Sequence, residues 1–141
     1  MSRTIALTGA TGFIGSILAR RLIKAGYNVQ ALVRPKTNRN RPTGSGVKWI
    51  EGTLEDLDRL RCLVHNADAV VHCAGAVRGN SEKQFNQINV KGVANLVHAA
   101  VEKHLFPRFL LISSLADRQP HLSHYAASKR PGEETLSADA G

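Results

Sequence analysis

Short apolar segments alternate with longer segments of helical periodicity along this chain of 141 residues. None of the connections between them carries the turn signal of a β-hairpin. Strands that alternate with helices in this way predict parallel strands joined by right-handed crossovers. We therefore expect an α/β fold, a doubly wound parallel sheet of at least five strands with helices on both faces. The expected strands are 4–8, 28–33, 47–51, 69–75 and 108–113, and the expected helices are 13–26, 54–64, 81–104 and 123–137.

Composition agrees with one domain that has a hydrophobic core, because 43% of the residues are hydrophobic. No apolar run approaches the roughly 18 residues that indicate a membrane span, so we expect no membrane association. The first residues enter a strand without the apolar stretch of a signal peptide, which predicts a cytoplasmic protein. Cys62 and Cys73 form no C-x-x-C motif. We expect both to be reduced thiols in or near the core.

The segment TGATGFIG, residues 8–15, lies between the first expected strand and the first expected helix. In that context Gly9 can make a tight turn, Gly12 can let the backbone approach a pyrophosphate, and Gly15 can let the helix pack closely. The helix N-terminus offers N–H groups and a positive dipole end to phosphates. A glycine-rich connection without a ligand is the alternative. For a Rossmann-like dinucleotide site, the expected cofactor-binding residues here are Gly9, Thr11, Gly12, Phe13, Ile14 and Gly15.

Arg34 follows the second expected strand, at the place where an NAD-binding domain usually carries Asp or Glu. A carboxylate there would bind the ribose 2′-hydroxyl, whereas an arginine can pair with a 2′-phosphate. We therefore expect NADP as the cofactor in preference to NAD. The alternative is that Arg34 merely belongs to a solvated loop.

The formal net charge of +8 raises the question of nucleic acid. Four of the basic residues lie close together in RPKTNRNR, residues 34–41, and the others are scattered. No zinc-finger or RNA-binding signature accompanies them. A solvated basic loop explains the cluster, a small phosphorylated ligand is the next interpretation, and we expect no nucleic-acid partner.

The segments TGATGFIG, HCAGAV, NVKGVANLVHAA, LLISS and YAASK follow one another along nearly all of the chain. In kind and order they resemble the short-chain dehydrogenases/reductases, in particular the extended branch of NAD(P)-dependent epimerases, dehydratases and reductases. The resemblance implies hydride transfer between a nicotinamide cofactor and a carbonyl or hydroxyl carbon. It also implies a substrate domain after the cofactor part. Because the chain stops at Gly141, soon after the last expected helix begins, we expect 1–141 to be an incomplete NAD(P)-binding domain.

Tyr125 and Lys129 are four residues apart, so on a helix they share one face. An ammonium near a phenol favours the phenolate, and such a tyrosine can exchange a proton with a substrate oxygen. The resemblance implies that Tyr125 is the acid/base and that Lys129 also holds the nicotinamide ribose. Without the other motifs, the pair would be an ordinary helix face.

Ser114 lies at the end of the fifth expected strand, directly after Ser113, where ligands of open parallel sheets bind. The resemblance implies that it holds the substrate oxygen, although some members use the next position, which is Leu115 here; a strand-end serine that caps backbone groups is the alternative. Asn89 lies among apolar neighbours in the long expected helix, and the resemblance implies a catalytic or proton-relay role. The small residues expected beside the cofactor are Ala74, Gly75 and Ala76.

After the third strand the family usually has an aspartate near the adenine, whereas this chain has Thr53. We expect Thr53 to offer one hydrogen bond and Leu54 a backbone group. His121 and His124 lie near Tyr125, but two loop histidines make a poor metal site, and we expect no metal.

Two classes of function remain open at this point. The first is an NADP-dependent oxidoreductase or epimerase that acts on a nucleotide sugar or a small carbonyl compound. The second is a non-catalytic dinucleotide-binding module with a regulatory or assembly role. The resemblance also implies a possible homodimer through helices 81–104 and 123–137.

Overall fold

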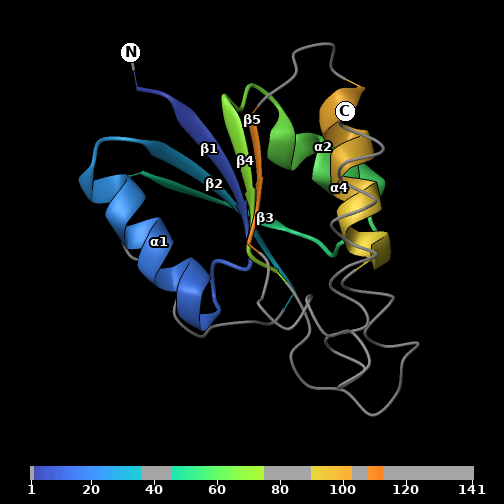
Figure 1. Cartoon of the computed structure of the whole chain (residues 1–141), viewed down its shortest axis with the longest axis horizontal. Coiled ribbons are helices and arrows are strands. Elements are labelled where there is room, and N and C mark those ends of the chain that lie inside the picture. The colour runs from blue at the N-terminus through green and yellow to red at the C-terminus, as the bar shows by residue number, and fades with distance from the viewer. Residues whose placement is uncertain (1, 36–45, 75–89, 103–107, 113–141) are drawn as a thin grey trace.

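The computed structural model describes residues 2–35, 46–74, 90–102 and 108–112 (Figure 1). In chain order, the elements are β1 (Thr4–Thr8), α1 (Phe13–Lys24), β2 (Asn28–Val33), β3 (Val47–Glu51), α2 (Leu57–Val64), β4 (Ala69–His72), α4 (Gly92–Val101) and β5 (Arg108–Leu111). Strands and helices therefore alternate as the sequence predicts, with two strands, β2 and β3, adjacent in the order of described elements.

All five strands form one parallel sheet in the order β3-β2-β1-β4-β5. The chain builds outward from β1 to β3 and then returns to the other side of β1 to place β4. In an open parallel sheet, ligands bind beyond the carboxyl ends of the strands at this point of reversal. The predicted doubly wound fold is confirmed, and its reversal point lies between β1 and β4.

The two faces of the sheet carry separate hydrophobic clusters because side chains alternate along each strand. Ile5 and Leu7 of β1 point toward α1, whereas Ala6 between them belongs to the cluster under α2 and α4. Figure 1 shows α1 on one side of the sheet and α2 with α4 on the other. The predicted coverage of both faces is therefore confirmed. The largest fully buried apolar side chains are Leu7, Leu60, Leu63, Leu96, Val29, Val33, Val70, Val93 and Val97.

Helix α1 ends at Lys24 rather than 26, two residues before the glycine that the sequence gives as its stop signal. Gly26 has a φ of +91°, and its N–H donates to the carbonyl oxygen of Ile23 at 3.0 Å. The N–H of Tyr27 donates to the carbonyl oxygen of Leu22 at the same distance. Glycine at this left-handed position satisfies the last carbonyl groups of the helix, so the chain can turn into β2.

Several elements are shorter than the sequence predicts. Helix α2 begins at Leu57 rather than 54, because Asp56 caps it by accepting from the N–H of Arg59 at 3.2 Å. Strand β4 ends at His72 rather than 75, and β5 ends at Leu111 rather than 113. Helix α4 ends at Val101 rather than 104, since periodicity without a capping residue does not mark an end. The expected helix residues 81–89 and the expected helix 123–137 lie outside the described residues.

A buried glutamine supports the end of α2. Gln30 of β2 is only 9% exposed, and its Nε2 donates to the carbonyl oxygens of Leu63 at 2.9 Å and His65 at 3.0 Å. These bonds satisfy two carbonyl groups at the helix C-terminus. The orientation of α2 on the sheet is therefore specified by a polar contact from the strand beneath it.

Candidate functional site

The glycine turn lies at the carboxyl end of β1, beside the reversal point of the sheet. Gly9 has a φ of +71°, which a residue with a side chain rarely adopts. A Cβ at Gly9 would stand 2.6 Å from both the Ala74 nitrogen and the Cys73 carbonyl carbon. The end of β4 therefore packs directly against the turn, and only glycine fits there.

Gly15 and Gly12 differ in what constrains them. A Cβ at the buried Gly15 would overlap the carbonyl oxygen of Gly9, so the close packing of α1 on the turn requires glycine. Gly12 is exposed, and the nearest atom to a Cβ there would be the Gly9 carbonyl oxygen at 3.3 Å. The fold itself tolerates a side chain better at Gly12 than at Gly15, so packing is a weaker reason for the glycine there.

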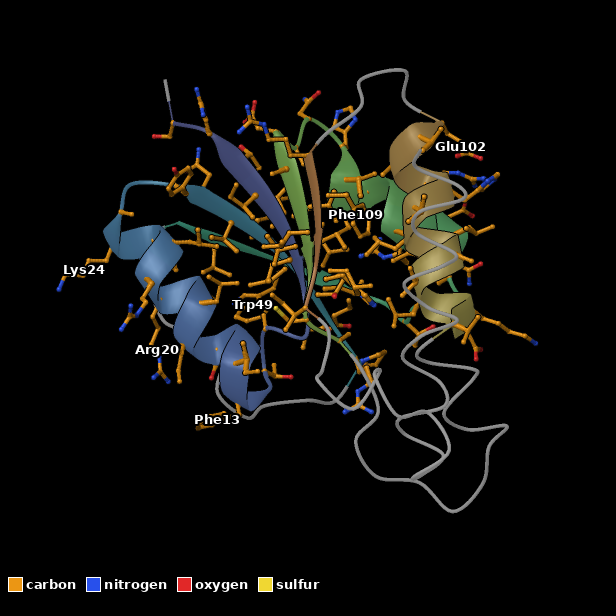
Figure 2. The ribbon with its side chains drawn as sticks, in the orientation of Figure 1. Phe13, Arg20, Lys24, Trp49, Glu102 and Phe109 are labelled. Carbon is orange, nitrogen blue, oxygen red and sulfur yellow. The ribbon has the colours of Figure 1, made fainter. Side chains whose placement is uncertain are left out.

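Helix α1 begins directly after this turn, and no side-chain hydrogen bond caps its N-terminus. Its first flanking residue is Gly12, which provides no side-chain cap, and its first turn contains no acidic residue. Phe13 is 83% exposed and Ile14 is 55% exposed, and Figure 2 shows Phe13 projecting from the first turn of the helix. First-turn N–H groups have no partner within a helix, and the positive end of the helix dipole lies among them. This end of α1 can accept a phosphate.

A hydrogen-bonded chain lies directly beneath the turn. The Thr8 hydroxyl lies 2.6 Å from Nδ1 of His72, and it accepts the N–H of Ala74 at 3.2 Å. Thr8 is 0% exposed and His72 is 1% exposed. Sequence reasoning missed His72, although a polar residue inside the apolar run AVVHCAG is a signal for a buried hydrogen bond.

Helix α4, which packs on one face of the sheet, holds the turn that follows β3. The Thr53 hydroxyl accepts the N–H of Glu55 at 3.3 Å, and the carbonyl oxygen of Leu54 accepts from Nδ2 of Asn95 in α4 at 2.8 Å. A Cβ at Gly92 would lie 2.8 Å from Cδ1 of Leu54, so the start of α4 packs on that side chain. Asn95 and Gly92 therefore fix the backbone where adenine contact is expected. Sequence reasoning named neither residue.

Arg34 directly follows β2 and is exposed. Because β2 pairs in parallel with β1, with Ala31 opposite Leu7, Arg34 and Gly9 leave the sheet at the same edge. The end of β3 brings Thr53 to this edge as well, and β4 brings Ala74. Four segments that are distant in sequence thus converge at one edge, where residues with phosphate-binding and adenine-binding chemistry can act together.

The structure does not describe the other residues that the sequence predicts for the site. The residues that lie outside the described part of the chain are Gly75, Ala76, Asn89, Ser114, Leu115, His121, His124, Tyr125 and Lys129.

Among the residues that are described, no group of histidines, cysteines and carboxylates could hold a metal ion. None of the described helices is long and apolar enough to cross a membrane. Both cysteines are free thiols and Cys73 is half-buried, but the predicted core location of Cys62 was wrong, since it lies on the exposed side of α2.

Comparisons with known proteins agree with this architecture. Residues 5–139 match the family model described as the NAD dependent epimerase/dehydratase family. The chain is 37% identical over 134 residues to a ceramide reductase of Caulobacter vibrioides, a match that covers 95% of this chain and 42% of that protein. It is 30% identical over 122 residues to a UDP-glucose 4-epimerase of Vibrio cholerae, covering 82% of this chain and 36% of the epimerase.

The fold is also that of solved structures. The crystal structure of Bordetella bronchiseptica WbmH in complex with NAD+ superposes with a TM-score of 0.87 at 24% identity. That match covers 99% of this chain and 53% of WbmH. The chain therefore spans about half the length of that structure, and less than half of the two similar enzymes above.

Proposed function

This chain belongs to the NAD-dependent epimerase/dehydratase family, and on that premise we propose that it is the cofactor-binding part of a nicotinamide-dependent oxidoreductase or epimerase. The observation that carries the proposal is the glycine turn at the reversal point of the sheet. Packing alone requires glycine at Gly9 and Gly15, whereas Gly12 presents its backbone outward beside an uncapped helix N-terminus. This arrangement fits a dinucleotide pyrophosphate.

The residues at the sheet edge suit the parts of such a cofactor. The pyrophosphate would lie against the turn from Gly9 to Gly15, with the backbone of Thr11, Phe13 and Ile14. The adenine would lie near Thr53 and Leu54. The order of the strands supports these assignments, because β1 and β3 end at the same edge with β2 between them. Ala74, Gly75 and Ala76 would line the cofactor beyond β4.

Arg34 is the feature that favours NADP over NAD. Its exposed guanidinium follows β2, where the adenosine ribose would come close. A guanidinium can form paired, charge-assisted hydrogen bonds with a 2′-phosphate. WbmH was crystallised with NAD+, so the preference for NADP proposed for this chain rests on Arg34 alone.

The chemistry would depend on Tyr125, Lys129, Ser114 and Asn89. When bound, the nicotinamide supplies or accepts the hydride. Tyr125 would exchange a proton with the substrate oxygen, Lys129 would favour the phenolate and hold the ribose, and Ser114 would orient the substrate oxygen. Asn89 would support this arrangement from its helix.

The substrate would be a nucleotide sugar or a small carbonyl compound. The similar enzymes differ in this respect, since one is named for ceramide and another for UDP-glucose. A homodimer through 81–104 and 123–137 belongs to the same proposal.

Fluorescence titration with NADPH and NADH tests the cofactor assignment. We expect the wild-type protein to bind NADPH at least about tenfold more tightly than NADH, the value of one charge-assisted contact. Arg34→Ala should remove this preference and leave NADH affinity unchanged. Arg20→Ala is the matched control, because Arg20 is an exposed arginine of α1 (Figure 2) that the proposed site does not use. Equal wild-type affinities would contradict the NADP assignment, and binding of neither cofactor would contradict the proposed function.

A further inference from the structure

His72 is a buried polar residue next to the reversal point of the sheet. Its partner Thr8 lies directly opposite it in the pairing of β1 with β4. The contact between Nδ1 and the Thr8 hydroxyl, at 2.6 Å, is short for a hydrogen bond and shielded from water. Interactions between polar groups are stronger in such an environment than at the surface. The pair therefore joins the two central strands immediately before the glycine turn begins.

The Thr8 hydroxyl also holds the chain beyond β4. It accepts the Ala74 N–H at 3.2 Å, which uses one of its two lone pairs, and its own proton is available to donate to Nδ1 of His72. In the tautomer that accepts this proton, the neutral imidazole carries its hydrogen on Nε2. A hydrogen-bonded sequence thus runs from the imidazole through the hydroxyl to the Ala74 amide.

The Ala74 amide packs against the glycine turn. Its nitrogen would lie 2.6 Å from a Cβ at Gly9, and the Cys73 carbonyl carbon would lie equally close. Such close contact leaves little room for one side to move without the other. A change in the position of Ala74 is therefore transmitted to the backbone that would hold the pyrophosphate.

We propose that His72 is a positioning residue for dinucleotide binding: as the acceptor for the Thr8 hydroxyl, it fixes the Ala74 amide and with it the glycine turn. This inference rests on the proposed function. It adds a role for a side chain that contacts neither the cofactor nor the reacting atoms.

Paired substitutions separate positioning from ordinary core packing. His72→Leu removes the acceptor, whereas His72→Asn retains an acceptor on the γ carbon, close to the place of Nδ1. Likewise, Thr8→Val removes the hydroxyl and Thr8→Ser retains it. We expect the Leu and Val variants to bind ADP about tenfold more weakly, the value of about one hydrogen bond, with adenosine affinity unchanged. The Asn and Ser variants should regain most of the ADP affinity.

A merely structural role predicts a different result. In that case, the Leu and Val variants would unfold at lower temperature while the folded protein kept its ratio of ADP to adenosine affinity, and this result would overturn the proposal. Two measurements on the protein without cofactor keep the test independent of folding and of the proposed function. The ¹⁵N chemical shifts of wild-type His72 should show an unprotonated Nδ1, and the Ala74 amide should exchange faster in Thr8→Val than in Thr8→Ser.

A protonated Nδ1, or equal exchange at Ala74 in the two Thr8 variants, would overturn the inference even if cofactor binding is normal. Failure of the wild-type protein to bind NADPH, NADH or ADP would instead contradict the proposed function. The results of the two tests can thus be distinguished.

Discussion

At the scale of single residues, glycines in this chain are required for different physical reasons. Gly9 combines a φ of +71° with backbone contacts from β4, whereas Gly26 has a φ of +91° and open space within 4 Å of where a Cβ would lie. Gly12 has neither a positive φ nor a neighbouring atom closer than 3.3 Å to such a Cβ. Alanine substitutions at these three glycines can therefore separate the effects of backbone strain, of collision with neighbouring atoms and of a lost ligand contact.

We expect Gly9→Ala to destabilise the protein most, because strain and collision add. Gly26→Ala is the matched control for strain alone and should cost about 1–2 kcal/mol. Gly9→Ala should cost more than about 2 kcal/mol, since backbone atoms at 2.6 Å must move apart. Gly12→Ala should cost less than about 1 kcal/mol and still weaken cofactor binding. Urea unfolding gives the three free energies, and an equal cost at Gly9 and Gly26 would contradict the packing of β4 on the turn.

At the scale of elements, ion pairs join α2 and α4 near their C-terminal ends. Arg61 of α2 contacts Glu102 at 2.8 Å and Asp58 at 2.8 Å, and His98 of α4 lies 2.9 Å from Glu102. Figure 2 shows Glu102 at the end of α4. The hydrogen bond from Arg61 lowers the pKa of Glu102 below its ordinary value. The cluster is exposed enough that salt screens it.

The pH dependence of this contact follows from the direction of the pKa shift. A carboxylate with a lowered pKa stabilises the folded state above its unfolded pKa of about 4.3, and that contribution is lost as pH falls through the folded value. We therefore expect Glu102→Gln to be less stable than wild type at pH 7, with the difference closing in acid. Thermal unfolding from about pH 7 to about pH 2 measures it. Glu51→Gln, an exposed glutamate of β3, is the control, and a pH-independent difference at Glu102 would refute the ion-pair explanation.

At the scale of the whole molecule, the sheet order decides which residues can act together. Gly9, Arg34, Thr53 and Ala74 are far apart in the chain, yet each follows a parallel strand that ends at the same edge. The order β3-β2-β1-β4 places Arg34 between Gly9 and Thr53, so the proposed 2′-phosphate contact would lie between the proposed pyrophosphate and adenine contacts. A dinucleotide is long enough to reach all of these segments, which supports the proposed site at the strand ends.

The proposed catalytic role of Tyr125 is tested at the scale of the whole molecule, because turnover requires cofactor and substrate to be bound together. Tyr125→Phe should lower kcat for any substrate found by at least about a hundredfold, as expected for loss of a general acid/base. Affinity for NADPH should stay within about twofold, since the hydroxyl is not proposed to hold the pyrophosphate. Steady-state kinetics and cofactor titration measure the two effects. Ser128→Ala, a neighbouring hydroxyl in YAASK, is the control, and full activity of Tyr125→Phe would exclude the assigned role.

The sequence by itself determined the features that depend on local physics. Hydrophobic periodicity predicted β2 and β3 with their observed bounds, and the glycine at 26 predicted the end of α1. Both signals act over a few residues, through side-chain alternation and backbone freedom. Where no capping or turn residue marks an end, as after Val101, the same reasoning extended the element too far. The order of the motifs, compared with a known family, predicted the match that covers 5–139.

Only the tertiary structure decided which distant groups meet. Gln30 reaches the end of α2, Asn95 holds the loop at Leu54, and His72 is hydrogen-bonded to Thr8 across 64 positions. Each contact depends on strand register and on the packing of helices over a particular face. Periodicity shows which side of a strand is buried, but it does not show which residue of another strand lies opposite. The glycine turn was therefore predictable from its spacing, whereas the hydrogen bonds that hold it became visible only once β1 and β4 were paired.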